Sequence, residues 1–178
     1  EGSNQSKGKP ISNLFASLNN DNKVTSIMLL PDQNENQKLL KILFITKKGK
    51  LRKNNIEDFQ NIQSNGIIAM KLDKGDEIAA VKLVRDDQDV LISTFNGLCL
   101  RTNINKIRLF KGRSSKGLKG IKLSNNDEVI SLSVINKVES SENEKKIILK
   151  NEDSKIKKNP KLMELKNKEQ YILSITEN

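Results

Sequence analysis

One stretch of the sequence, residues 108–123, combines many cations with three glycines and lacks any acidic residue. Glycines at 112, 117 and 120 allow close approach of the backbone to a ligand and a positive φ. Exposed cations beside accessible main chain suit a phosphate backbone, whose charge is spread along its length. The residues predicted to make these contacts are Arg108, Lys111, Arg113, Lys116 and Lys119.

The spacing of Gly112 and Gly117 resembles that of a nucleotide-binding phosphate loop. Such a loop requires Lys and then Ser or Thr after its second glycine, whereas this chain has Leu118 and Lys119 there. The motif therefore fails, and the segment is predicted to contact an extended phosphate backbone.

The chain is poor in groups that catalyse reactions. It has no histidine, so no imidazole is present for proton transfer near neutral pH or for binding a metal. Cys99 is expected to be buried in a strand, and Tyr171 is expected to pack within another strand. Asp76 and Asp127 precede equivalent strands, and their carboxylates are expected to accept backbone N–H groups in turns. The sequence thus predicts a non-catalytic fragment without a metal site or cofactor of its own.

The composition favours a globular, basic protein. The 178 residues carry 32 Lys and Arg against 22 Asp and Glu, a formal net charge of +10, which favours a negatively charged partner. A single cysteine excludes an intrachain disulfide and suits a reducing compartment. No apolar run approaches the ~20 residues of a membrane span, so we expect a cytoplasmic protein without a membrane partner.

An internal repeat organises the chain. Residues 41–53 align with residues 89–101 at an offset of 48, and residues 66–78 align with residues 117–129 at an offset of 51. The three extra positions fall in the loop that carries the basic stretch. Each repeat has short β-branched apolar runs and turns such as Phe95-Asn-Gly97, which is typical of hairpins. Four short strands in about 50 residues are typical of a β-propeller blade.

The repeat predicts an all-β propeller fragment with about two complete blades and partial flanking blades. Residues 1–37 would end a preceding blade, with a strand at 24–30. Residues 38–87 and 88–135 would form the complete blades, and residues 169–178 would begin a further, truncated blade. Residues 136–168 contain ten lysines and six acids and are predicted to be a flexible charged insertion, with a short helix at 161–166. We expect this insertion to be a solvated linker, and contact with DNA is the less favoured alternative.

A second set of cations follows the repeat. Residues 36–56 of the first repeat also lack acids, and Arg101 aligns with Lys53. Cations that recur after the hairpin turn of successive blades would line one rim, although solvated turns would give the same pattern. Five Phe and one Tyr are few for stacking on single-stranded bases, which favours the phosphates of duplex DNA. The cations predicted in this set are Lys47, Lys48, Lys50, Arg52, Lys53 and Arg101.

Several segments together resemble the C-terminal domain of DNA gyrase A. They are Gly8–Leu14, Gly66–Ile78 and above all Arg108–Leu123, and the resemblance covers about residues 7–135 and 169–178. It implies a six-bladed β-pinwheel, a propeller whose blades exchange strands, with DNA wrapped around a basic outer rim. The heptad Gln-Arg-Arg-Gly-Gly-Lys-Gly that marks gyrase is absent from these residues. The related protein of topoisomerase IV therefore stays open as the alternative.

The resemblance implies a non-catalytic domain that binds and wraps duplex DNA to support supercoiling by a type II topoisomerase. The rest of DNA gyrase A, together with DNA gyrase B, would be its protein partners. ATP and Mg²⁺ would serve the parent complex, and the catalytic tyrosine would lie outside this chain. The alternative function is a β-propeller scaffold whose basic rim binds an acidic protein.

Overall fold

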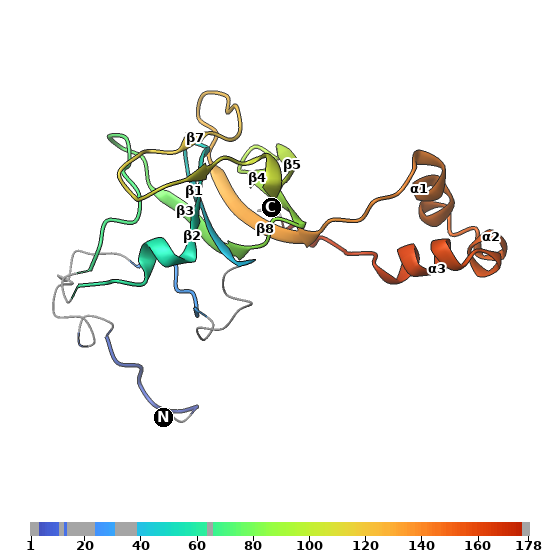
Figure 1. Ribbon diagram of the computed structural model, residues 1–178, viewed down its shortest axis with the longest axis horizontal. Coiled ribbons are helices and arrows are strands. Elements are labelled where there is room, and N and C mark those ends of the chain that lie inside the picture. Colours follow the sequence, from blue (N-terminus) through green and yellow to red (C-terminus); the bar gives the residue numbers. More distant parts are fainter. Residues whose placement is uncertain (1–3, 11–12, 14–23, 31–38, 64–65, 176–178) are drawn as a thin grey trace. The chain divides into compact units, whose positions relative to one another are not determined.

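The computed structural model describes residues 4–10, 13, 24–30, 39–63 and 66–175 (Figure 1). Contacts divide the chain into two compact units, residues 1–134 and 135–178, and each is described by itself. No helix in the described ranges is long and apolar enough to cross a membrane.

The first sheet combines strands from both repeats. Its order is β3-β1-β2-β6, and β7 also pairs with β2. Strand β1 pairs antiparallel with both β2 and β3, β6 runs parallel to β2, and β7 runs antiparallel to β2. The strand bounds are β1 Lys41–Thr46, β2 Lys50–Asn55, β3 Ile78–Val84, β6 Leu109–Phe110 and β7 Leu118–Lys119.

The second sheet has the order β5-β4-β8. Its strands are β4 (Gln88–Thr94), β5 (Cys99–Asn103) and β8 (Val129–Asn136). A short 3-10 helix follows the second strand of each hairpin, η3 (Ile56–Phe59) after β2 and η4 (Ile104–Lys106) after β5. The two hairpins and the strands beside them therefore repeat one plan, which confirms the predicted all-β, propeller-type fold for this unit.

The same hydrogen bonds occur at equivalent positions of the two repeats, which confirms the repeat. The Thr46 hydroxyl accepts the N–H of Lys50 at 3.1 Å, and the Thr94 hydroxyl accepts the N–H of Leu98 at the same distance. In the first turn Asp76 accepts the backbone N–H of Lys48 at 3.1 Å. The equivalent bond in the second turn joins Asp127 to the N–H of Asn96 at 3.0 Å. The two aspartates thus hold turns, as predicted.

The core forms on both faces of β1. Leu43 and Ile45 enter a cluster shared with the second sheet, whereas Ile42 and Phe44 face a second cluster with η3 and Met70. Successive side chains of a strand point to opposite faces, so a strand buried on both faces reads as a continuous apolar run. The sequence Ile42–Ile45 is such a run.

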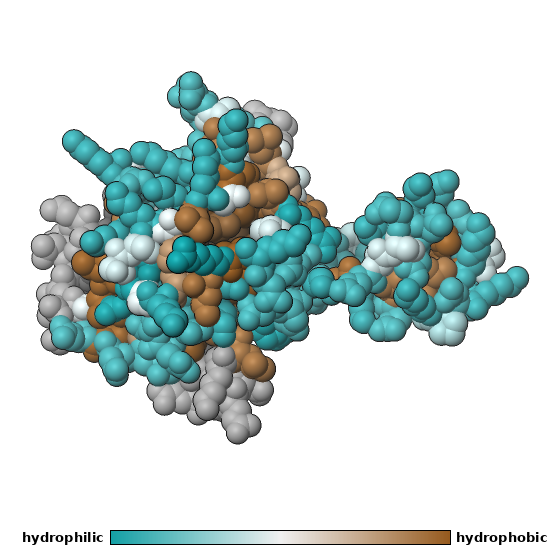
Figure 2. Space-filling view, turned by 45° about the horizontal axis from the view of Figure 1, so that its top comes forward, coloured by the Kyte–Doolittle hydropathy of each residue, from teal (hydrophilic) through white to brown (hydrophobic). Residues whose placement is uncertain are grey.

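The second unit is helical, which corrects the expectation of one short helix. It contains α1 (Glu142–Leu149), α2 (Asp153–Lys158) and α3 (Pro160–Asn167), of which only the last overlaps the predicted helix. Ser141 and Glu144 form a capping box at α1, and the Asn159 side chain caps α3. Figure 2 shows hydrophilic residues over most of the visible face of this unit. Ile156, Leu162 and Leu165 form its buried core.

Two predicted strands are absent from the described residues. Residues 24–30 and 169–175 have no strand, and Ile27 and Tyr171 are 80% and 84% exposed. The prediction that Tyr171 packs in a strand is therefore wrong, and its hydroxyl donates to Glu169 at 2.9 Å. A strand requires a hydrogen-bonded neighbour, and the described part of the chain offers none to either segment.

Cys99 is exposed, which also corrects the prediction. It begins β5, which lies at the edge of the second sheet with β4 as its only described neighbour. An edge strand leaves one side open to solvent, so an apolar run alone does not ensure burial.

Candidate nucleic-acid interface

The basic stretch is held against the edge of β2 by two buried polar side chains. The guanidinium of Arg52 donates hydrogen bonds to the carbonyl oxygens of Gly112 and Ser115, and to that of Arg113 at 3.2 Å. The Asn54 amide donates to the carbonyls of Gly112 at 2.8 Å and Phe110 at 3.1 Å. Because both side chains are fully buried, the chain path between β6 and β7 is fixed from inside.

Two of the three glycines in this stretch permit close packing on Leu51. An added Cβ on Gly117 would lie 2.4 Å from the Leu51 carbonyl oxygen, and one on Gly120 would lie 2.3 Å from the Leu51 side chain. Gly117 also has a φ of +76°. These glycines therefore serve the docking of β7 on β2, whereas the prediction assigned them to approach of the ligand.

Arg52 and Lys53 do not belong to an exposed rim. They are 0% and 4% exposed. Lys53 contacts Asp86 at 3.0 Å and the Ile104 carbonyl at 2.9 Å, and burial lowers the pKa of the Arg52 guanidinium, which stays charged. Their role in this fold is to stabilise packing between strands, which revises the prediction that they contact phosphates.

Four further predicted cations form ion pairs. Lys47 lies between Glu77 at 3.2 Å and Glu128 at 3.6 Å, which raises the lysine pKa. Arg101 pairs with Asp89 at 2.7 Å. The remaining two, Lys50 and Lys116, share one acid, Asp73.

Asp73 bridges the two repeats. It contacts Lys116 at 2.7 Å and also Lys50, which opens β2. These hydrogen bonds, that of Lys116 most strongly, lower the pKa of Asp73 to about 2. The two basic windows contain no acid in the sequence, but acids from other parts of the chain lie beside their cations in the fold. These acids neutralise much of the positive charge of the windows.

The other predicted cations have no acidic partner in the described part of the chain. The Lys48 ammonium donates to the Lys74 carbonyl at 3.1 Å. The Arg108 guanidinium lies 5.2 Å from the centroid of the Phe110 ring, and the Arg52 guanidinium lies 5.3 Å from the same centroid. Four of these cations lie together in sequence on the segment held by β2. They are Arg108, Lys111, Arg113 and Lys119.

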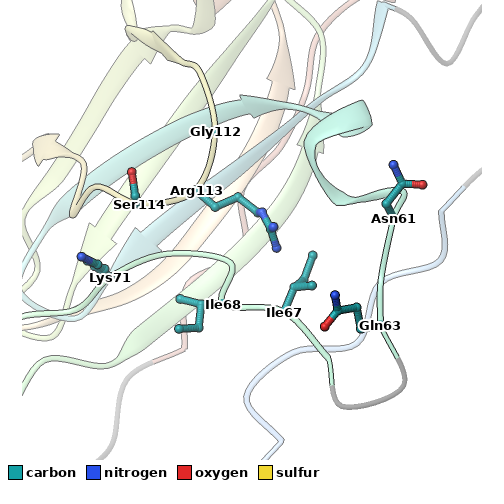
Figure 3. A pocket seen from close by; sticks show the side chains of 8 residues that line it. All are labelled: Asn61, Gln63, Ile67, Ile68, Lys71, Gly112, Arg113 and Ser114. Atoms are coloured by element: carbon teal, nitrogen blue, oxygen red, sulfur yellow. The ribbon is translucent and has the colours of Figure 1, made fainter.

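A hollow of about 510 Å³ lies beside this segment. Figure 3 shows the Arg113 side chain reaching across it towards Ile67, with Lys71 and Ser114 at one end and Asn61 at the other. Among its lining residues Arg113 and Lys71 are charged, and both are cations. The sequence gives little signal for Lys71, because it is a single cation after an apolar segment and lies outside the basic windows 36–56 and 108–123.

In the described part of the chain no three His, Cys, Asp or Glu side chains gather as metal ligands. A smaller hollow of about 240 Å³ is lined by residues of β5 and β7, and its lining includes the apolar Leu100 and Phe110 and the cations Arg101 and Lys119.

Comparison with known proteins supports the propeller-type fold. The family model described as "DNA gyrase C-terminal domain, beta-propeller" matches residues 40–85 and 88–136, more than half of the chain. DNA gyrase A of Rickettsia prowazekii (strain Madrid E) is 35% identical over 98% of this chain, which covers 21% of that protein. The chain thus spans about a fifth of that relative.

Two solved structures share the fold. The C-terminal domain of DNA topoisomerase IV has a TM-score of 0.64 at 21% identity, covering 73% of this chain and 39% of that one. A DNA gyrase A C-terminal domain has a TM-score of 0.62 at 24% identity, covering 74% and 42%. Taken with the family match over both repeats, these findings show that the chain belongs to the family of DNA gyrase C-terminal domains, which are β-propellers.

Proposed function

We propose that this chain binds the phosphate backbone of duplex DNA and supports DNA wrapping by a gyrase. The proposal rests on one observation about the segment 108–119. Four of its cations lack an acidic partner among the described residues, and β2 holds their backbone in place. A cation that is already paired gains less from a phosphate because it must give up its partner. The unpaired set is therefore the favoured contact surface.

Duplex DNA fits this surface better than a single strand. Binding of single strands uses aromatic rings on which bases stack. In the segment 108–119 the one aromatic residue is Phe110, which is half-buried and lies against two guanidinium groups. Contacts to phosphates without base stacking carry little sequence preference.

The same proposal assigns the chain its place in a larger protein. It would be part of DNA gyrase A in a cytoplasmic type II topoisomerase, and it would act with the rest of that polypeptide and with DNA gyrase B. ATP and Mg²⁺ would be used elsewhere in that complex. The support is the family match and the naming of relatives as DNA gyrase A.

A salt series tests the proposal directly. Binding of the chain to a short labelled duplex is measured by fluorescence anisotropy at increasing KCl, with several unrelated duplex sequences. We expect log K to fall linearly with log salt, by roughly 0.9 per phosphate contacted, at similar affinity for each sequence. A flat dependence, or tighter binding to an acidic protein than to DNA, would favour the protein scaffold instead.

A further inference from the structure

The turn between β6 and β7 has its carbonyl groups drawn inward. Three carbonyl oxygens, those of Gly112, Arg113 and Ser115, accept from the buried guanidinium of Arg52. The Ser115 carbonyl also accepts the backbone N–H of Lys71 at 3.3 Å. A guanidinium offers five N–H donors in a fixed plane, so one side chain can orient several peptide groups at once.

This orientation determines where the N–H groups of the same peptides point. In a planar trans peptide the C=O and the following N–H point in opposite directions, and the described residues contain no cis peptide. The N–H groups of Arg113, Ser114 and Lys116 must therefore point away from Arg52. Ser114 and Lys116 are exposed and Arg113 is half-buried, so this outer side of the turn is open to solvent.

The outward N–H groups have no acceptor in the described part of the chain. Within the ranges that the structure describes, the backbone N–H groups of Arg113, Ser114 and Lys116 donate no hydrogen bond. The side chains beside them are cationic, and Lys111 and Arg113 also lack an ion-pair partner there. Backbone donors and cations on one surface are the combination that binds phosphate oxygens.

The charged partner of Lys116 is shared with a second lysine. Asp73 contacts the Lys116 ammonium at 2.7 Å, and the same acid contacts Lys50 at the start of β2. In the described part of the chain no acid forms an ion pair with the side chains of Lys111 or Arg113. A phosphate that contacts Lys111 or Arg113 would therefore displace no acid of the described residues.

We propose that the turn Gly112–Lys116 binds phosphate oxygens of duplex DNA through its backbone N–H groups as well as its cations, with Arg52 as the positioning residue. The inference rests on the proposed function and deepens it. Carbonyls that converge on one guanidinium leave N–H groups that diverge, which suits successive phosphates of a strand better than one small anion. Arg52 itself touches no DNA, because it is fully buried.

The repeat supplies an internal comparison. The residue that aligns with Arg52 at an offset of 48 is Leu100, so the second blade has no guanidinium at this position of its hairpin. The arrangement is therefore a feature of the edge of β2 and does not recur on β5.

Two substitutions at Ser114 separate the backbone from the side chain. Ser114→Pro removes one outward N–H without changing charge, and that N–H has no acceptor in the described structure to lose. Ser114→Ala keeps the N–H and removes the hydroxyl. A hydrogen bond to a charged oxygen corresponds to roughly tenfold in affinity, so Ser114→Pro should weaken duplex binding by about that factor at an unchanged salt slope. Ser114→Ala should bind as the unchanged chain does.

Amide NMR gives a readout that needs no variant. On titration of the ¹⁵N-labelled whole chain with a short duplex, we expect the amide protons of Arg113, Ser114 and Lys116 to move downfield. Arg52→Lys keeps the charge but cannot form the planar fork. It should shift and broaden these amide signals and weaken duplex binding without altering the salt slope. If the Arg52→Lys variant does not fold, the comparison of Ser114→Pro with Ser114→Ala still tests the backbone contact.

The outcomes are distinct. Wild-type affinity for Ser114→Pro, or unmoved amide signals at the three residues while DNA binds, would overturn the backbone contact and leave the proposed function standing. Absence of salt-dependent duplex binding by the unchanged chain would instead overturn the proposed function itself. The amide spectrum of Ser114→Pro away from the turn checks that the variant is folded.

Discussion

Gly117 lies so close to the carbonyl oxygen of Leu51 that an added Cβ would be 2.4 Å from it. This contact joins two parts of the chain that belong to different repeats and allows β7 to pair with β2. Because the backbone of β2 cannot yield as a flexible side chain can, the contact specifies glycine. The basic segment thus depends on packing as well as on charge.

Gly117→Ala should therefore destabilise the first unit more than Gly112→Ala. Both glycines have positive φ, +76° and +67°, so both substitutions carry the cost of about 1–2 kcal/mol for that conformation. An added Cβ on Gly112 meets nothing within 4 Å, so only Gly117→Ala adds a clash. Urea unfolding of both variants measures the difference. Equal losses of stability would show that β7 does not pack on Leu51 as described.

Acid should weaken the contact between the repeats through Asp73. Its pKa in the folded chain is about 2, below the ordinary 3.8, because Lys116 and Lys50 bond to the charged form. The stability that it contributes is present above pH 3.8 and is lost as the pH falls from there through about 2. An NMR titration of the Asp73 carboxyl checks this. A midpoint near 3.8 would mean that the two lysines do not hold it.

Asp73→Asn should strengthen DNA binding while it weakens the fold. The substitution releases Lys50 and Lys116 from their shared acid, and both side chains retain some exposure. The salt slope of duplex binding should become steeper by up to roughly 0.9 for each released cation. Binding of this variant across a KCl series provides the measurement. An unchanged slope would place both lysines away from the DNA.

The three-helix unit should be able to unfold while the two sheets stay folded. Leu162 is 3% exposed in its small core, and truncation of a buried leucine costs about 2–5 kcal/mol. Leu162→Ala should therefore remove the helical circular dichroism and leave the amide signals of β1–β5 unchanged. Met163→Ala is the matched control, because Met163 is 47% exposed. Loss of the β signals in Leu162→Ala would show that the two units fold together.

The repeated parts of the fold were predictable because each repeat carries its own local chemistry. Thr46 and Thr94 accept the same turn bonds, and Asp76 and Asp127 hold the same turns, so alignment of the chain on itself was sufficient. The missed helix α1 also had a local signal. Ser141 and Glu144 stand at the spacing of a capping box, which the charge of the segment obscured.

The candidate site was less predictable because its decisive contacts are remote in sequence. Arg52 lies in a basic window, yet its partners are carbonyl groups 60 to 63 residues away, which residue types do not reveal. Asp73 lies outside both windows without acids and still reaches Lys50 and Lys116. Spacing of charges along the chain therefore indicated a basic surface but could not separate paired from unpaired cations.

The salt slope of duplex binding, measured for two variants of equal net charge, separates contact by the unpaired cations from an effect of bulk charge. The first replaces the unpaired cations Arg108, Lys111, Arg113 and Lys119 with alanine, and the second replaces the paired cations Lys47, Lys50, Arg101 and Lys116. We predict that the first variant loses roughly 0.9 of slope per cation and that the second loses much less. Equal losses would contradict this prediction, because bulk charge alone would then explain the binding.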